Sequence, residues 1–188
     1  MTGARSRGVR LAVPGAGILP PMAVTIRTGD AGDMQRVFPM LYRRLEERAA
    51  MDPTYFALRP DAPARFRHWI GPALEDPRHA LVVAEEGGAI IGCLAATVEQ
   101  DLPIYVHDEY AVVRVLWVDP QYRGKGIAGR MLEHAARECG QFGLRQLRAS
   151  AAVAREIEKH VLKKAGFRAA GITFLRDLRP PAPDADAE

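Results

Sequence analysis

Residues 121–129 read Gln121-Tyr122-Arg123-Gly124-Lys125-Gly126-Ile127-Ala128-Gly129, and this is the most informative stretch of the chain. A nearly continuous apolar run from Tyr110 to Val118 precedes it and predicts a buried strand, which Asp119-Pro120 ends because proline cannot donate to a ladder. After it, apolar residues recur at the spacing of one helix face: Ile127, Ala128, Met131, Leu132, Ala135, Ala136 and Cys139. The glycines therefore lie where a buried strand passes into an amphipathic helix.

A glycine-rich turn at the start of a helix is suited to bind phosphate. The first N–H groups of a helix have no internal partner and carry partial positive charge, and glycine lets a ligand approach the backbone closely. Arg123 and Lys125 add two cations beside these donors. Residues 123–129, Arg123, Gly124, Lys125, Gly126, Ile127, Ala128 and Gly129, are thus predicted to bind a pyrophosphate. The alternative is a solvated glycine loop with no ligand.

Two common phosphate motifs fit this stretch poorly. A P-loop needs Ser or Thr after the lysine, and Lys125 is followed by glycine; the spacing of three glycines alone is weak support for a dinucleotide fold. The stretch from Arg123 to Ala128 matches the pattern Arg/Gln-x-x-Gly-x-Gly/Ala, and so does the overlapping frame from Gln121 to Gly126. It closely resembles motif A of the GNAT acetyltransferases, which binds the pyrophosphate of acetyl-CoA. Lys164-Ala165-Gly166-Phe167 resembles the end of the family's motif B.

Composition favours one domain without a nucleic-acid partner. The chain has 188 residues, 48% of them hydrophobic, and its 26 basic residues nearly balance 23 acidic ones, for a formal charge of +3. So mild an excess does not predict nucleic-acid binding. Cys93 and Cys139 both lie in apolar patterns and are expected to be free buried thiols, which fits a cytoplasmic location. No apolar run is long enough for a membrane helix.

The order of predicted elements is the order of the GNAT fold, which the resemblance extends over residues 22–178. Strands are expected near 23–27, 79–85, 89–99, 110–118, 144–150 and 167–178, and helices near 34–50, 63–75, 127–139 and 155–165. The fold class is α/β (α+β), with a mixed, mostly antiparallel sheet of about six to seven strands, flanking helices and a splayed central strand pair. Residues 1–21 and 179–188 are expected to be disordered extensions.

Catalytic roles are harder to assign than the cofactor loop. The resemblance implies that Leu116, Trp117 and Val118 line the pantetheine and the thioester, and that a base removes a proton from an acceptor amine. The family often has a glutamate on the central strand, but Arg114 and Val115 stand there. The candidate bases are therefore the charged residues at the start of that strand and just before it: Glu109, Asp108 and His107. Glu99 is a further candidate, and the alternative is that all of these side chains are simply solvated.

Motif B departs from the family pattern at two positions. Arg155 replaces an asparagine that commonly contacts pantetheine, and Leu162 replaces a tyrosine that commonly protonates the departing thiolate. His160 is a candidate replacement acid if its helix face turns inward, the alternative being a surface histidine. Because a thiol has a pKa near 8.5, a dedicated acid is helpful but not indispensable.

Arg114 is the candidate specificity residue. A guanidinium in an apolar strand needs a partner, which is expected to be Asp108 or Glu109, or else an acidic group on the substrate. Trp69, Tyr55 and Trp117 are either core or pocket wall, with core favoured for Trp69 and pocket for Trp117.

The sequence thus predicts an N-acetyltransferase that uses acetyl-CoA and no metal. The expected acceptor is a small-molecule amine, and the second choice is a peptide or protein amine. A different class of function is also open: a GNAT domain that binds acyl-CoA as a sensor without turnover, which the changes at Arg155 and Leu162 motivate. Neither a nucleic-acid nor a membrane partner is expected, and a homodimer is compatible with the sequence.

Overall fold

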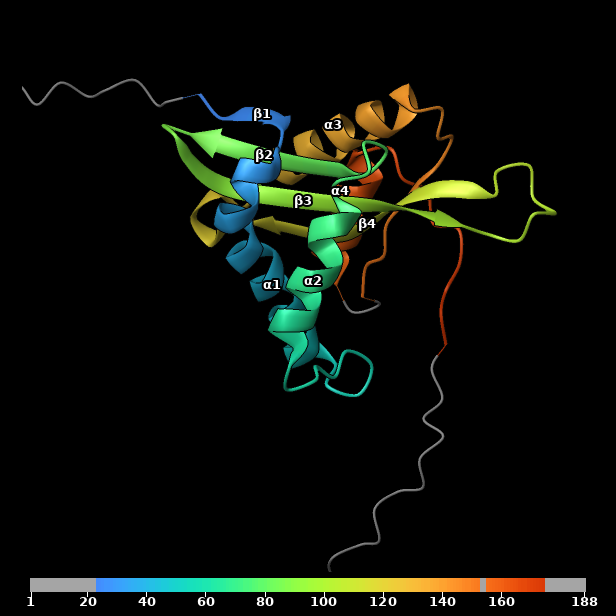
Figure 1. Ribbon diagram of the computed structural model, residues 1–188, viewed down its shortest axis with the longest axis horizontal. Coiled ribbons are helices and arrows are strands. Elements are labelled where there is room, and N and C mark those ends of the chain that lie inside the picture. Colours follow the sequence, from blue (N-terminus) through green and yellow to red (C-terminus); the bar gives the residue numbers. More distant parts are fainter. Residues whose placement is uncertain (1–22, 153–154, 175–188) are drawn as a thin grey trace, which may run out of the picture.

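The computed structural model describes residues 23–152 and 155–174 and shows a curled sheet between two helical layers (Figure 1). Five strands form the sheet in chain order: β1 Thr25–Thr28, β2 Ala80–Glu86, β3 Ala89–Gln100, β4 Glu109–Val118 and β5 Leu147–Arg148. The helices are α1 Met34–Met51, α2 Ala62–Ala73, α3 Ile127–Gln141 and α4 Glu156–Lys164, with short 3-10 turns η1 Ala31–Asp33 and η2 Pro120–Tyr122.

The sheet is mostly antiparallel, as predicted. β1 to β4 pair antiparallel with their neighbours in sequence, and β5 joins the edge of β4 in parallel. The predicted strand at 167–178 does not form over its described part, residues 167–174, and its remainder lies outside the described residues, as do the extensions at 1–21 and 179–188. A further strand needs an edge to pair with, and β5 offers only two residues.

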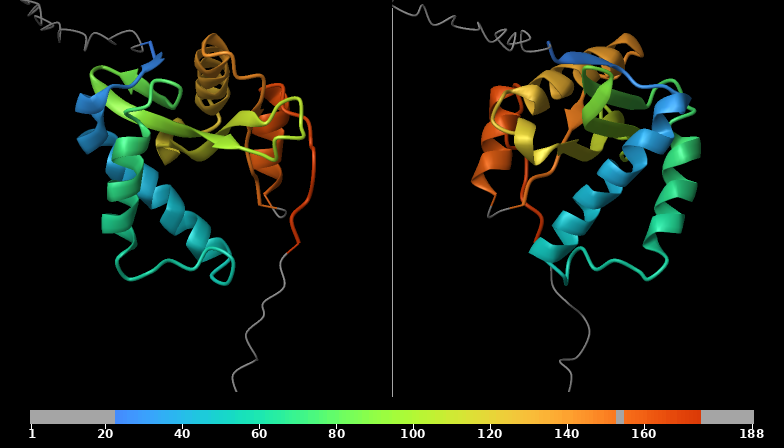
Figure 2. Two further views of the ribbon diagram at one scale, coloured as in Figure 1. Left: turned by 45° about the vertical axis from the view of Figure 1, so that its right-hand side comes forward. Right: turned by 90° about the vertical axis from the view of Figure 1, so that its left-hand side faces the viewer.

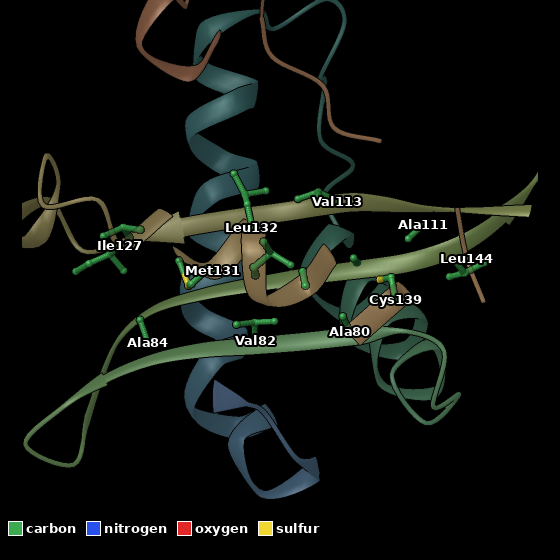
Figure 3. Packing of buried hydrophobic residues seen from close by; sticks show 14 of the residues in the cluster. Ala80, Val82, Ala84, Ala111, Val113, Ile127, Met131, Leu132, Cys139 and Leu144 are labelled. Carbon is green, nitrogen blue, oxygen red and sulfur yellow. The ribbon is translucent and has the colours of Figure 1, made fainter. Parts of the chain in front are cut away.

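Helices cover both faces of the sheet, so its strands are buried on both sides (Figure 2). α1 and α2 cover one face, over a cluster that includes Val83, Cys93 and Trp117. α3 covers the other face and packs Met131 and Leu132 against residues such as Val82 (Figure 3). Alternation along each strand explains this division, because successive side chains point to opposite faces.

Several local features of the strands and helices follow from individual residues. α1 includes Pro39 within its second turn and remains continuous from Met34 to Met51. Gly92 lies at a close backbone approach, since a Cβ at this position would stand 3.1 Å from the Trp117 carbonyl oxygen. Cys93 and Cys139 are free and buried, and burial raises the pKa of the Cys93 thiol to about 12. Within the described ranges, no helix has the length and apolarity needed to cross a membrane.

Candidate acetyl-CoA and acceptor site

A bulge and a gap in strand pairing open the sheet at β4. Ala95 of β3 pairs with Val115 while Ala96 pairs with Val113, so Arg114 is an extra residue on β4. On the other edge of β4, β5 pairs only with Ala111 and Val112. From residue 113 onward this edge of β4 has no strand partner within the described residues, which produces the expected splay.

The N–H groups along the open edge are directed toward the gap. The Asp119 N–H donates to the Ile91 oxygen of β3 over 2.9 Å. Because successive residues of a strand point their polar backbone groups to alternate sides, the N–H groups of Val118 and Leu116 face away from β3. The splayed edge therefore offers donors to a ligand lying between β4 and β5.

The glycine loop follows directly at the end of β4. Asp119 accepts a hydrogen bond from the Gln121 N–H at 2.9 Å and starts the η2 turn. Gly124 and Gly126 have φ values of 81° and 76°, which favour glycine, and neither has an atom within 4 Å of the place of a Cβ. Gly126 is the N-cap of α3 and makes no side-chain cap, so the first-turn N–H groups have no partner within the helix.

Side chains of the loop fix its position on the sheet. The Tyr122 hydroxyl donates to Glu86 at 2.7 Å, which raises the pKa of this phenol, and Lys125 Nζ lies 4.8 Å from the Tyr122 ring centre. Arg123 Nε donates to the Val118 oxygen at 2.9 Å, and its Nη2 contacts Glu47 of α1 at 3.2 Å. Arg123 thus holds the loop, whereas Lys125 has no ion pair within the described part of the chain.

The other predicted cofactor residues divide between core and surface. Ile127 is 2% exposed and anchors the first turn of α3 in the core, while Ala128 and Gly129 are partly exposed. Leu116 is partly exposed, and Trp117 and Val118 are buried. The expectation that the Trp117 side chain lines a pocket is therefore wrong: it packs under α1 and α2, and its Nε1 is buried without a partner.

Arg114 forms a polar cluster on the face that α2 covers. Its Nε donates to Thr97 Oγ1 at 2.7 Å, its Nη2 pairs with Glu99, and its guanidinium lies 5.7 Å from the Trp69 ring centre. The expected partners Asp108 and Glu109 are not used. β3 provides both partners because the bulge turns Arg114 toward this face. Trp69 is 45% exposed, so it is not the core residue that was expected.

The predicted bases before β4 lie at the other end of the strand from the loop. Glu109 is eight residues from Trp117, or about 26 Å along an extended strand, and pairs with Arg78 at 3.2 Å. Asp108 is joined to Asp101 through its backbone oxygen, and His107 lines a hollow of about 370 Å³ that Arg148 also lines. The structure does not bring these three residues to the splay. Glu99 also lies toward that end, paired with Tyr110, but its carboxylate contacts the guanidinium of Arg114 at the bulge.

The remaining predicted residues lie on or near the surface. His160 is exposed on α4, whose partly buried residues Val161 and Leu162 pack on the core. Arg155 pairs with Glu158 at 3.3 Å. Tyr55 is 48% exposed and stands edge-on to Phe56, with ring centres 4.5 Å apart.

Sequence reasoning missed Arg48 and Thr97. Arg48 of α1 donates to Ser150 Oγ at 2.9 Å and contacts the Arg114 oxygen at 3.5 Å. Thr97 is 3% exposed within an apolar stretch of β3. Thr97 could have been predicted, because a hydroxyl next to alanines in an apolar strand needs a hydrogen-bond partner. Arg48 could not, because it is one of several arginines on α1 and its neighbours in sequence do not distinguish it.

Comparison with known proteins shows the family of this chain. The sequence profile of the acetyltransferase (GNAT) family matches residues 42–167, which include the bulge, the splay and the glycine loop. The chain belongs to the GNAT acetyltransferase family. As a GNAT protein, it is an acetyl-CoA-dependent N-acetyltransferase by class. No curated protein sequence gives a significant match.

Solved GNAT structures share the fold at low sequence identity. An acetyltransferase with acetyl-CoA from Clostridium acetobutylicum is 20% identical, with a TM-score of 0.67 over 83% of this chain and 97% of that chain. An aminoglycoside 6'-N-acetyltransferase from Acinetobacter haemolyticus is 14% identical, with a TM-score of 0.62 over 83% and 99%. A glucosamine-6-phosphate N-acetyltransferase from Arabidopsis thaliana is 17% identical, with a TM-score of 0.58 over 84% and 99%.

The described residues also bear on metal binding. Between residues 23 and 174, leaving out 153 and 154, no three His, Cys, Asp or Glu side chains gather closely enough to hold a metal ion.

Proposed function

We propose that this GNAT protein transfers the acetyl group of acetyl-CoA directly to the amine of a small molecule. The pyrophosphate would lie on residues 123–129, and the pantetheine would follow the open edge of β4 past Val118 and Leu116 toward the bulge. One observation carries this assignment: the strand that loses its partner is the strand that ends in the glycine loop. A single extended ligand can therefore contact both.

The backbone is arranged to assist the reaction. As the amine nitrogen attacks, the thioester oxygen gains negative charge, and an N–H group fixed along the open edge of β4 can stabilise it. The amine forms a bond to the acetyl carbon while the bond to sulfur breaks, so CoA leaves as a thiolate. The proton that the amine releases needs an acceptor.

Glu99 is the proposed general base, acting directly or through a water molecule. Its carboxylate is 38% exposed and is held at the bulge by Arg114. Tyr110 provides a second, longer contact at 3.5 Å. A small-molecule acceptor is favoured because the aminoglycoside and glucosamine-6-phosphate acetyltransferases that share this fold are named for small amines.

A substitution at Gly126 tests the cofactor site. An aspartate there is strained at a φ of 76° and places a carboxylate beside the pyrophosphate, so acetyl-CoA affinity should fall at least about 100-fold. Calorimetric titration with acetyl-CoA measures the change. Gly140→Asp is the matched control, because it adds the same carboxylate to α3 in open space near the other end of the helix. If Gly126→Asp binds acetyl-CoA as the parent does, the assignment of the loop is wrong.

A sensor without turnover is the second candidate function. Leu162 packs on the core where the family commonly has a catalytic tyrosine, and Arg155 is occupied by Glu158. CoA release measured with a panel of amines separates the two candidates. Tight acetyl-CoA binding with no release above the hydrolytic background would support the sensor and contradict the enzyme.

A further inference from the structure

Arg48 of helix α1 lies at the gap between β4 and the chain that follows β5. If the pairing of Ala111 with Leu147 and Val112 with Arg148 continued in register, Arg114 would stand opposite Ser150. Arg48 contacts both, through Nη2 to Ser150 Oγ at 2.9 Å and Nη1 to the Arg114 oxygen at 3.5 Å. Its guanidinium therefore occupies the point where β4 and the chain after β5 separate.

The charges around this point leave Arg48 without an acidic partner. Glu47 pairs with Arg44 at 3.5 Å and with Arg123 at 3.2 Å. Glu158 pairs with Arg44 at 2.6 Å and with Arg155 at 3.3 Å. The carboxylates of Glu47 and Glu158 are thus paired with three other arginines. Among the described residues, no carboxylate forms a salt bridge with Arg48.

Arg48 is also partly withdrawn from water. Its guanidinium carbon lies 4.9 Å from the Phe56 ring centre. Burial lowers the pKa of the guanidinium and the charge of Arg44 lowers it further, whereas the charges of Glu158 and Tyr55 raise it; an arginine stays protonated throughout. A partly buried cation without a salt-bridge partner is unfavourable, and an anion that reaches it gains a charge-assisted contact.

Arg114 is not available to bind an anion of the substrate, because its charge is already paired. Arg114 had been the sequence-based candidate for binding an acidic group of the substrate, but Glu99 already neutralises it. Arg48 touches the backbone oxygen of Arg114, whereas Glu99 touches its side chain. An acceptor approaching the bulge therefore meets a carboxylate and an unneutralised guanidinium in the same region.

We propose that Arg48 binds an anionic group of the acceptor, a carboxylate or a phosphate, so that the substrates of this enzyme are anionic amines. The proposal rests on the acetyl transfer proposed above. The planar guanidinium suits two-point binding of either group, and the long contact of Nη1 leaves that donor available.

Paired acceptors test the proposal. An amino acid is compared with its amide, and an aminoalkyl phosphate with the corresponding amino alcohol, in the parent and in Arg48→Gln. In the parent, one anionic member should be used at least about 10-fold more efficiently than its neutral twin, and the pair that shows this identifies carboxylate or phosphate. Arg48→Gln should raise KM for that anionic acceptor about 10- to 100-fold and leave KM for its twin and for acetyl-CoA unchanged.

Two control variants separate recognition from support of the fold. Arg44→Gln removes the same charge one helical turn earlier, from an arginine that has carboxylate partners, and should leave the preference for the anionic acceptor intact. Ser150→Ala removes the hydrogen bond of Arg48 but keeps its charge, and should behave like the parent. If Ser150→Ala reproduces the loss seen in Arg48→Gln, Arg48 is a structural clamp and the proposal is overturned.

Binding provides a readout that does not depend on turnover. Acceptor pairs are titrated calorimetrically into the complex with CoA, where no acetyl group can be transferred. Tighter binding of an anionic member, lost in Arg48→Gln, supports the proposal even if the release assay finds no enzyme activity. Equal binding of both members of each pair, or a loss confined to acetyl-CoA affinity, overturns it.

Discussion

At the bulge of β4, the charge of Arg114 is already balanced before any ligand binds. Thr97 and Glu99 accept from its guanidinium on one side, and Trp69 covers it on the other. The bulge also releases backbone groups of β4 from pairing. One irregular residue thus links a fixed carboxylate to the open edge where the thioester is proposed to lie.

Replacing Glu99 with glutamine tests its proposed role as the base. The amide retains the shape and can still accept from Arg114, but it cannot take a proton, so kcat should fall about 100- to 10,000-fold while acetyl-CoA affinity is retained. Glu109→Gln, the same change at the other end of β4, should keep kcat within about 3-fold of the parent. Steady-state CoA release measures both. A large loss in Glu109→Gln with none in Glu99→Gln would restore the sequence-based candidate.

At the scale of elements, the turn before α1 is fixed by a compact charged network. Asp30 accepts from the N–H groups of Gly32 and Asp33, and the Asp33 side chain accepts from the Asp30 N–H. Asp33 is 4% exposed, and its carboxylate accepts hydrogen bonds from Arg27 Nη1 at 2.6 Å and from Arg27 Nη2 at 2.9 Å. This network ties the end of β1 to the helix that carries Arg48.

Stability should depend on Asp33 in acid. Hydrogen bonds from Arg27 hold the pKa of Asp33 below its ordinary value, so its contribution is complete above about pH 4 and falls as pH drops through the lowered pKa. Asp33→Asn should therefore lose about 2–3 kcal/mol at pH 7 and much less near pH 2, by urea unfolding. The partly exposed Asp76, also paired with an arginine, is the control and should lose far less on change to Asn. An equal deficit at both pH values for Asp33→Asn contradicts this account.

At the scale of the whole molecule, one sheet separates two apolar layers that must fold together. Val82 and Val83 are adjacent on β2, both 0% exposed, and they point into opposite layers. Because each layer is closed by helices that pack on the same strands, neither can form without the sheet.

Val82→Ala and Val83→Ala should each cost about 2 kcal/mol of unfolding free energy, from lost apolar burial and a small cavity. The double variant should lose close to the sum, within about 0.5 kcal/mol, because the two side chains point to opposite faces of the sheet and pack in different clusters. Circular dichroism and tryptophan fluorescence during urea unfolding should give one coincident transition for all three variants. Two separate transitions would mean that the layers unfold independently.

Local sequence patterns account for β1 to β4 and the four helices, for the burial of the central strands and for the position of the glycine loop, although the strand expected from residue 167 does not form over residues 167–174. Each depends on neighbours in the chain: continuous apolar runs in β2 and β3, helical spacing from Ile127 to Cys139, and glycines where positive φ is needed at 124 and 126. Local patterns of this kind are written directly into the sequence.

Contacts between distant segments, by contrast, fix which charged residues meet at the bulge. The pairing of Arg114 with Glu99 depends on a bulge that shifts the register of β3 against β4, and no periodicity of the sequence marks it. The placement of Arg48 between Arg114 and Ser150 joins segments 66 and 102 residues apart. The sequence therefore indicated the loop that we propose for the cofactor, while long-range packing brings together the side chains that we propose for binding and activating the acceptor.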